Sequence, residues 1–184
     1  MKYVLFICLT ILLFNCKNTD QAYIQTIIQE WTNKKIIFPD DIQAKIVGRD
    51  TNCNYLLLKP IKILVYVDSI GCTACKLNFY DWYQKINSLG KITDLAFLFY
   101  VNTKNFKILT NAIKAEGFNY PVFYDTHNIL AKTNHFPKNS RFNTFLLDKE
   151  NKVVLIGDPL GREKMWELYI QTIDSLSKSL KSIH

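Results

Sequence analysis

The chain has 184 residues, of which 48% are hydrophobic and 14% aromatic, and this composition excludes an intrinsically disordered protein. The length suits one domain with a sizeable core and some additional chain. The formal net charge is +7, but the lysines are scattered and form no long basic stripe. Because a nucleic-acid-binding surface needs basic residues on one face or a known motif, we predict no nucleic-acid partner.

The first 16 residues are typical of an export signal. Lys2 provides the positive charge that is usual at the start of a signal peptide, and an apolar stretch follows from Tyr3 to Phe14. This stretch is too short to span a membrane, which takes about 20 residues, but it fits the apolar region of a signal peptide. A plain signal peptide and an uncleaved anchor are the two simplest interpretations.

The end of the signal resembles the lipobox of bacterial lipoproteins, in which a cysteine is lipidated and becomes the mature N-terminus. Leu13 and Cys16 fit that pattern, whereas Phe14 and Asn15 depart from it because small residues are usual there. A polar stretch, residues 17–21, follows like a tether. We therefore predict a lipid anchor on Cys16 and a protein held to a membrane of the cell envelope, facing the periplasm.

The tether and an N-terminal extension are predicted to occupy residues 17–59. Apolar residues at three- and four-residue steps predict a helix from Ala22 to Trp31, and the chain then breaks at Pro39. One or two strands are expected between Ile42 and Leu58. No chemistry can be assigned to this extension.

A short, β-branched apolar run from Ile63 to Val67 predicts a buried strand. Turn-prone residues follow it, and then Cys72 and Cys75 at Cys-x-x-Cys spacing. A helix is predicted next, with its inward face formed by Leu77, Phe79, Tyr80, Tyr83, Ile86 and Leu89.

This placement puts Cys72 at or near the N-terminus of a helix. Unpaired backbone N–H groups and the helix dipole favour an anion there, so the Cys72 thiol is expected to have a lowered pKa and to act as the nucleophile. Cys75 is placed to resolve the mixed disulfide that Cys72 forms. A structural zinc site is disfavoured because it usually takes four ligands, and no second Cys-x-x-Cys pair exists.

Two of the five cysteines fall within the predicted signal and anchor, namely Cys8 and Cys16. Export would place the others in an oxidising compartment, where the Cys72–Cys75 pair persists as a disulfide unless a reductant is supplied. We interpret Cys53 as a buried small hydrophobic residue. A regulatory or intermolecular thiol is the alternative.

The remaining elements alternate between strands and helices. The apolar run from Leu95 to Val101 predicts a central strand buried on both faces. The last helix should face the core with Met165, Trp166, Leu168, Tyr169, Ile173 and Leu176. Between them the pattern predicts a helix at Thr103–Glu116, a short strand at Tyr120–Tyr124, a helical turn at Asn128–Lys132, a hairpin formed by Thr144–Asp148 and Lys152–Ile156, and the terminal helix at Arg162–Leu180. The fold class is therefore α/β, a central mixed sheet flanked by helices.

From about Pro60 to Ile173 the chain resembles the thioredoxin fold, especially the bacterial membrane-anchored thiol–disulfide oxidoreductases related to the redoxin group. The strand and Cys72–Cys75 turn match its active-site region, and residues 143–153 match the hairpin beside it. Residues 116–125 match a segment typical of the anchored group. The resemblance predicts a thioredoxin-like sandwich domain in residues 60–184 after the N-terminal helical and strand extension.

The resemblance implies a redox-active Cys72–Cys75 disulfide, and substrate contacts from Gly71, Asn143 and Thr144. It implies no cofactor and no metal. The expected partners are an exported protein that contains a disulfide and an unidentified thiol electron donor.

Three positions depart from the family pattern. Asn143 stands where a cis-proline is usual, and we predict a trans bond because a cis bond before a non-proline residue costs about 3–4 kcal/mol. Tyr66 stands where a buried acid usually moves protons to the second cysteine, and Asp68 could substitute for that acid or be a surface turn residue. Gly71 replaces the usual tryptophan before the first cysteine.

Two other functions stay open at this point. A redoxin-type peroxidase would use Cys72 against peroxide, but Val65 stands where its signature has proline. The other is a redox-inactive lipoprotein that uses the fold as a binding module or holds a soft metal between Cys72 and Cys75. The direction of disulfide exchange is not fixed by the sequence, and reduction or isomerisation is the expectation from resemblance alone.

Overall fold

The computed structural model describes residues 20–40, 42–69, 77–89, 92 and 94–182. Within these residues one mixed sheet has the strand order β2-β1-β5-β4-β3-β6-β7. The strands are β1 (Ala44–Ile46), β2 (Arg49–Thr51), β3 (Ile61–Val67), β4 (Leu95–Val101), β5 (Val122–Tyr124), β6 (Thr144–Leu147) and β7 (Val153–Ile156). Strands β3, β4 and β5 run parallel, whereas β6 pairs antiparallel with β3 and β1 pairs antiparallel with β5.

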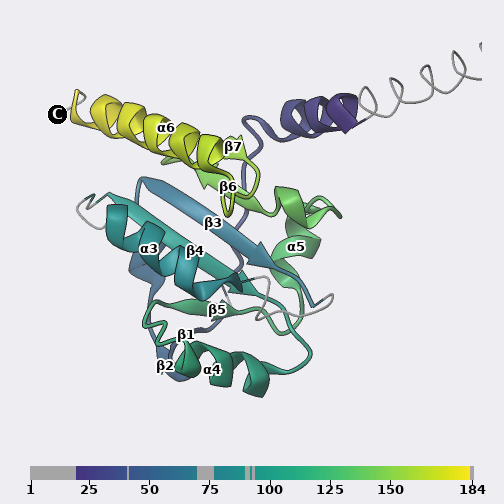
Figure 1. Ribbon diagram of the computed structural model, residues 1–184, viewed down its shortest axis with the longest axis vertical. Coiled ribbons are helices and arrows are strands. Elements are labelled where there is room, and N and C mark those ends of the chain that lie inside the picture. Colours follow the sequence, from purple (N-terminus) through teal and green to yellow (C-terminus); the bar gives the residue numbers. More distant parts are fainter. Residues whose placement is uncertain (1–19, 41, 70–76, 90–91, 93, 183–184) are drawn as a thin grey trace, which may run out of the picture.

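Helices cover both faces of this sheet (Figure 1). One face packs against α3 (Phe79–Leu89), α4 (Phe106–Ala115) and α6 (Glu163–Lys181). The other face packs against the helix at residues 20–31, the 3-10 turn η1 (Asn54–Leu56) and α5 (Ile129–Asn134). A second 3-10 turn, η2 (Ser140–Phe142), leads into β6. The predicted α/β sandwich is confirmed, including two strands and a helix in the N-terminal extension.

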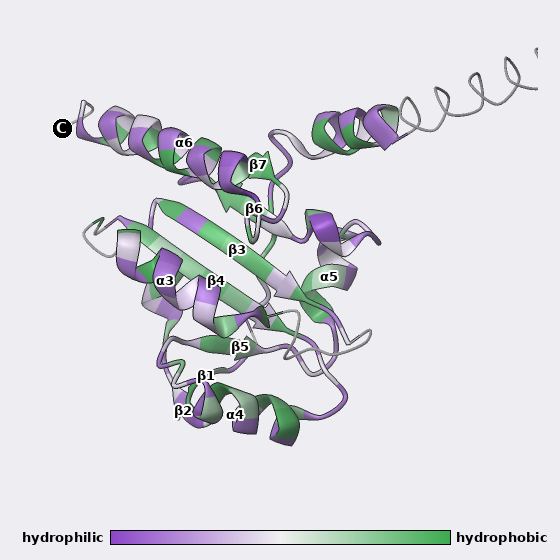
Figure 2. Cartoon of the chain, viewed as in Figure 1, coloured by the Kyte–Doolittle hydropathy of each residue, from purple (hydrophilic) through white to green (hydrophobic). Residues whose placement is uncertain are grey.

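The centre of the molecule is built from β3 and β4, which are hydrophobic along almost their whole length (Figure 2). The seven residues of β3 are all buried, because alternate side chains enter the two cores on the two faces of the sheet. Ile63, Val65 and Val67 face the α3 side, whereas Leu64 and Tyr66 face the α5 side. The unbroken apolar runs therefore predicted the two central strands correctly.

One residue of β3 is charged and still buried. Lys62 is 1% exposed, and its amino group donates a hydrogen bond to the carbonyl oxygen of Lys59 at the start of the strand. Burial lowers the pKa of Lys62, and Asp148 partly opposes this. The sequence pattern placed the strand start at Ile63 because a lysine is rarely buried, so this residue was missed.

The inward faces of two helices differ from the prediction. In α3 the buried residues are Phe79, Trp82 and Leu89, whereas Tyr80 is 64% and Tyr83 44% exposed. In α6 Leu168 is 43% exposed, while Tyr169 and Ile173 are buried as expected. Phe79, which has no polar atom, and Trp82, which has the largest ring system, pack against the sheet, and tyrosine keeps its hydroxyl in water at little cost. The predicted faces were therefore wrong at Tyr80, Tyr83 and Leu168.

Cys53 is buried at 1% exposure and is a free thiol, which confirms its interpretation as a small core residue. Burial raises the pKa of its thiol, so the thiol stays protonated and unreactive. No helix in the described part of the chain is both long enough and apolar enough to cross a membrane. The predicted signal and anchor, including Cys16, lie outside the described residues.

Candidate functional site at the carboxyl end of β3

A cleft of about 350 Å³ lies where β3 ends. Four segments of the described chain line it: the end of β3, the start of α3, the η2–β6 connection and the loop between β7 and α6. The lining residues are Val65, Tyr66, Val67, Asp68, Asn78, Trp82, Ser140, Arg141, Asn143, Thr144, Asp158, Leu160 and Arg162. The cleft therefore brings together residues that are up to 97 positions apart in the sequence, from Val65 to Arg162.

The predicted cysteine pair lies in residues 70–76, outside the described residues, and so does Gly71. The chain on either side of that segment is described. Asp68 precedes it and Asn78 follows it, and both line the cleft. Helix α3 proper begins at Phe79, because Asn78 has a left-handed backbone with φ 37°. The predicted position of Cys72 at a helix N-terminus stays a prediction.

Asn143 and Thr144 lie in the cleft, as their predicted contact with a substrate requires. Both side chains are buried, at 4% exposure each. No described peptide bond is cis, so the prediction of a trans bond before Asn143 is confirmed. The backbone N–H of Tyr66 donates to the carbonyl oxygen of Asn143 at 2.9 Å, which ties the start of β6 to the end of β3.

The side chain of Asn143 has an unusual environment for a buried amide. Its Oδ1 atom is buried and accepts no hydrogen bond from any residue that the structure describes. A buried acceptor without a partner costs about 1–3 kcal/mol, which is rarely retained without a reason. Asn143 therefore buries an amide oxygen at a position where a proline would carry no such group.

Tyr66 stands where the resemblance to the thioredoxin fold predicts a buried acid that transfers protons, and it does not take over that role. Its hydroxyl donates to Asn128 Oδ1 on the α5 face of the sheet, and its ring packs edge-on against Phe136. Burial, together with Asp68 and Asp125, raises the pKa of Tyr66 well above its ordinary value. The hydroxyl thus keeps its proton. Asp68 lies one residue beyond β3, half-buried in the cleft wall.

Asp158 is a cleft residue that sequence reasoning missed. It is half-buried in the β7–α6 loop, where its Oδ1 accepts a hydrogen bond from the N–H of Leu160 at 2.9 Å. Burial raises the pKa of this carboxyl, and the Leu160 N–H, Arg162 and Lys85 oppose the shift only in part. The sequence showed only a Gly- and Pro-containing loop there, and nothing in it placed this loop opposite residue 143.

The raised pKa of Asp158 makes stability depend on pH. At pH values between 3.8, the ordinary pKa of this carboxyl, and its higher pKa in the folded chain, the folded chain binds more protons than the unfolded chain. The free energy of unfolding therefore falls as the pH rises through the folded pKa. Asp158→Asn keeps an acceptor for Leu160 and removes this loss. We expect the variant to gain up to about 1 kcal/mol at pH 7 and nothing at pH 3, measured by urea unfolding. An equal difference at both pH values would contradict this explanation.

The hydroxyl group of Tyr169 binds the backbone at the start of β6 and directly after the end of β7. Its fully buried hydroxyl donates to the Gly157 carbonyl oxygen at 3.0 Å and lies 3.3 Å from that of Thr144. Tyr169→Phe leaves these carbonyl groups without the hydroxyl, and we expect a loss of about 1–2 kcal/mol in the free energy of unfolding. Tyr80→Phe, at an exposed position of α3, is the matched control and should leave stability unchanged. Equal effects in chemical denaturation would show that the Tyr169 hydroxyl has no such role.

No protein-family model and no curated protein matches this sequence. Solved structures do match. A candidate thiol:disulfide interchange protein DsbE from Chlorobium tepidum is 14% identical, with a TM-score of 0.57 over 76% of this chain and 96% of that one. A candidate protein disulfide isomerase from Bacteroides thetaiotaomicron is 18% identical, with a TM-score of 0.56 over 78% and 89%. The chain has a thioredoxin fold.

Peroxiredoxin Q from Xanthomonas campestris has the same fold, with 14% identity and a TM-score of 0.55 over 79% of this chain and 99% of that one. The likeness therefore spans thiol–disulfide exchange proteins and a peroxiredoxin. In this thioredoxin fold the cleft lies beside the connection from β3 to α3, where the sequence carries Cys72 and Cys75.

Proposed function

We propose that this chain is an exported thiol–disulfide oxidoreductase that uses Cys72 and Cys75 to reduce or isomerise disulfides in exported proteins. One observation carries the proposal. In a thioredoxin fold, the residues on either side of the Cys-x-x-Cys segment, Asp68 and Asn78, line the same cleft as Asn143 and Thr144. A partner disulfide seated in this cleft would lie beside the segment that carries both thiols.

The proposed reaction is a two-step exchange. The Cys72 thiolate attacks one sulfur of the partner disulfide, forms a mixed disulfide and releases the other partner sulfur as a thiolate, which takes up a proton. The Cys75 thiol then loses its proton and attacks the sulfur of Cys72, which breaks the mixed disulfide and releases the second partner sulfur as a thiolate that takes up a proton. The partner gains two electrons and two protons, and Cys72–Cys75 becomes the disulfide. A thiol donor must reduce this disulfide again, and the reverse sequence oxidises a partner.

The described residues shape this site in two ways. Asp68 and Asp158 are the carboxyl groups of the cleft, and Arg141 and Arg162 are its cations. Burial raises the pKa of Asp158 above its ordinary value, so this carboxyl keeps its proton to a higher pH than an exposed aspartate does. Asn143 holds its wall of the cleft to β3, because its carbonyl oxygen accepts a hydrogen bond from the N–H of Tyr66. A lipid anchor on Cys16 would hold the protein at the envelope membrane.

A redox titration of the full chain tests the proposal. The protein is equilibrated in glutathione buffers of increasing oxidation, and free thiols are trapped with a mass-shifting alkylating reagent. We expect one two-electron transition between about −270 and −120 mV, the range of proteins with such motifs. Cys53→Ala should keep the transition because Cys53 is a buried core thiol. Absence of any transition would refute the proposal, and peroxide consumption by Cys72 alone would favour a peroxidase.

A further inference from the structure

A second hollow surface lies between the β1–β2 hairpin and helix α4. It consists of two adjoining grooves of about 710 and 650 Å³, which share Gly48, Thr110 and Lys114. We call this surface the hairpin groove. None of the described residues that line it also lines the cleft at the end of β3. The hairpin groove is therefore a separate feature of the molecule.

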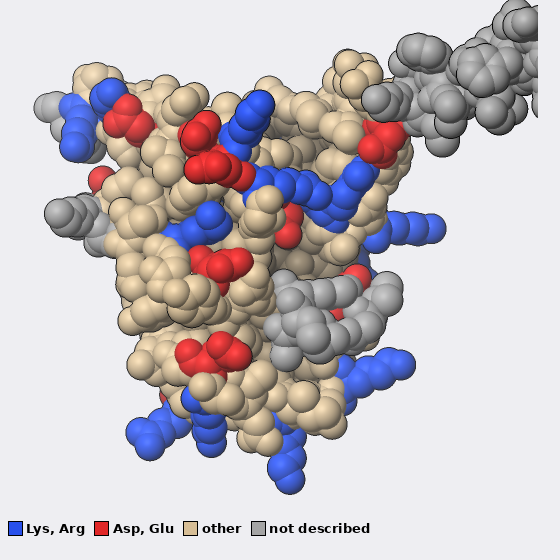
Figure 3. Space-filling view, in the orientation of Figure 1, with Lys and Arg blue, Asp and Glu red and all other residues tan. Residues whose placement is uncertain are grey.

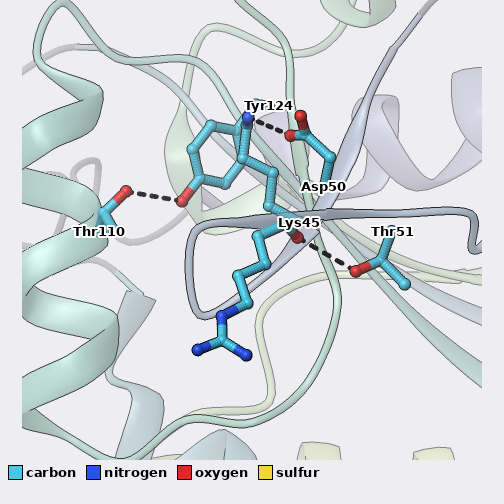
Figure 4. A network of polar contacts seen from close by, with 6 residues as sticks. Lys45, Asp50, Thr51, Thr110 and Tyr124 are labelled. Carbon is cyan, nitrogen blue, oxygen red and sulfur yellow. Dashed lines mark hydrogen bonds and ion pairs between the residues drawn. The ribbon is translucent and has the colours of Figure 1, made fainter.

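The walls of the hairpin groove are fixed against each other. Val47 and Gly48 form the hairpin turn with φ values of 50° and 80°, and a Cβ atom on Gly48 would lie only 2.6 Å from Thr110 Cγ2 of α4. The Thr110 and Tyr124 hydroxyl groups are 3.0 Å apart, which links α4 to β5 (Figure 4). Because these walls are already in place, little conformational entropy is lost when a ligand binds.

The charges of the hairpin groove have one sign. Its four charged lining residues are Lys45, Arg49, Lys107 and Lys114. Lys45 pairs with Asp50 beside the groove (Figure 4), whereas none of the other three forms an ion pair with a described residue. Lys and Arg side chains project from the lower end of the molecule, where α4 and the hairpin lie (Figure 3). The groove would therefore attract an anion.

The uncharged residues that line the hairpin groove indicate which class of anion it would bind. Gln43, Asn111 and Thr126 provide donors and acceptors of the kind that a polypeptide backbone needs. Phe106 and Tyr124 are stacked on each other with ring centroids 4.9 Å apart, and Tyr124 is only 7% exposed. Phe106 is half-buried, so none of the aromatic rings among the described lining residues is fully open for the stacking by which single-stranded nucleic acids bind.

The position of the groove argues against a membrane as its ligand. Residues 20–31, through which the chain enters the domain, lie at the end of the molecule opposite α4 (Figure 1). A membrane that holds the proposed N-terminal anchor would lie on that far side. With the chain anchored there, a groove at the opposite end would face away from the membrane.

We propose that the hairpin groove binds an acidic polypeptide segment of a partner protein. Exposed lysine and arginine side chains contribute mainly to the rate of association and to specificity, so the complex is weak and sensitive to salt. This binding uses no residue of the cleft. It therefore stands or fails separately from the proposed disulfide exchange.

The test uses the purified full chain and a fluorescent peptide of about ten glutamate residues. In polarisation measurements near 50 mM salt, we expect Lys107→Gln with Lys114→Gln to weaken binding about five- to tenfold. Lys164→Gln with Lys181→Gln on α6 removes the same charge elsewhere and should change binding less than about twofold. High salt should abolish the difference, and turnover of a disulfide substrate should be the same in all forms.

Three results would overturn this proposal. The first is absence of peptide binding by the wild-type chain at low salt. The second is an equal loss in both double variants, which would show that only the net charge matters. The third is tighter, groove-dependent binding of a single-stranded oligonucleotide or of phosphatidylserine vesicles than of the peptide. In each case a normal redox titration would leave the proposed oxidoreductase function standing.

Discussion

Cys72→Ser is expected to lower turnover of a peptide disulfide at least about a thousandfold, because a serine hydroxyl is not ionised at neutral pH and cannot replace a thiolate nucleophile. Cys75→Ser should lose turnover to a similar extent for a different reason. It retains the first attack but cannot resolve the mixed disulfide, so a covalent complex with the substrate accumulates. Turnover is measured with a fluorescent peptide disulfide, and the complex by mass spectrometry.

Cys53→Ala is the matched control for both cysteine variants. Cys53 is 1% exposed, packs in the core on the α5 side of the sheet and is not among the residues that line the cleft. The variant should keep turnover near the wild-type level while losing some stability. Wild-type turnover by Cys72→Ser would show that another group attacks the disulfide and would remove the basis of the assignment.

Trp82→Ala is expected to cost about 3–5 kcal/mol of unfolding free energy, which is a large part of the stability of a typical domain. Trp82 is 1% exposed, and its ring contacts Phe97 and Phe99 of β4 edge-on at centroid distances of 6.1 and 5.6 Å. Truncation leaves a cavity between α3 and the sheet. Because Trp82 also lines the cleft, turnover should fall as well.

Trp166→Ala gives the comparison for this loss. Trp166 is half-buried on α6, and Lys85 lies over its ring at 4.1 Å from the centroid. The same truncation at a partly exposed site should cost only about 1 kcal/mol in urea unfolding. Similar losses at the two sites would mean that α3 is less tightly packed against β4 than the structure indicates.

Local sequence determined the elements near the site. The apolar runs that became β3 and β4 have a strong intrinsic pattern, since a strand buried on both faces must be apolar almost throughout. The hairpin of β6 and β7 and the helices α4 and α6 followed from their turn residues and from helical periodicity. The cysteine spacing between a strand and a helix was also visible, and the disulfide exchange proposed for it came from resemblance to a known fold.

Tertiary structure decided which of these elements meet. Asp68, Asn143 and Asp158 line one cleft because β6 pairs with β3 and the β7–α6 loop returns over both. Sequence periodicity is local and contains no information on strand order, so Asp158 was missed and so was the hairpin groove. The inward face of α3 and the burial of Lys62 were likewise settled by packing, because burial depends on the neighbours that surround a side chain and not on the residue type alone.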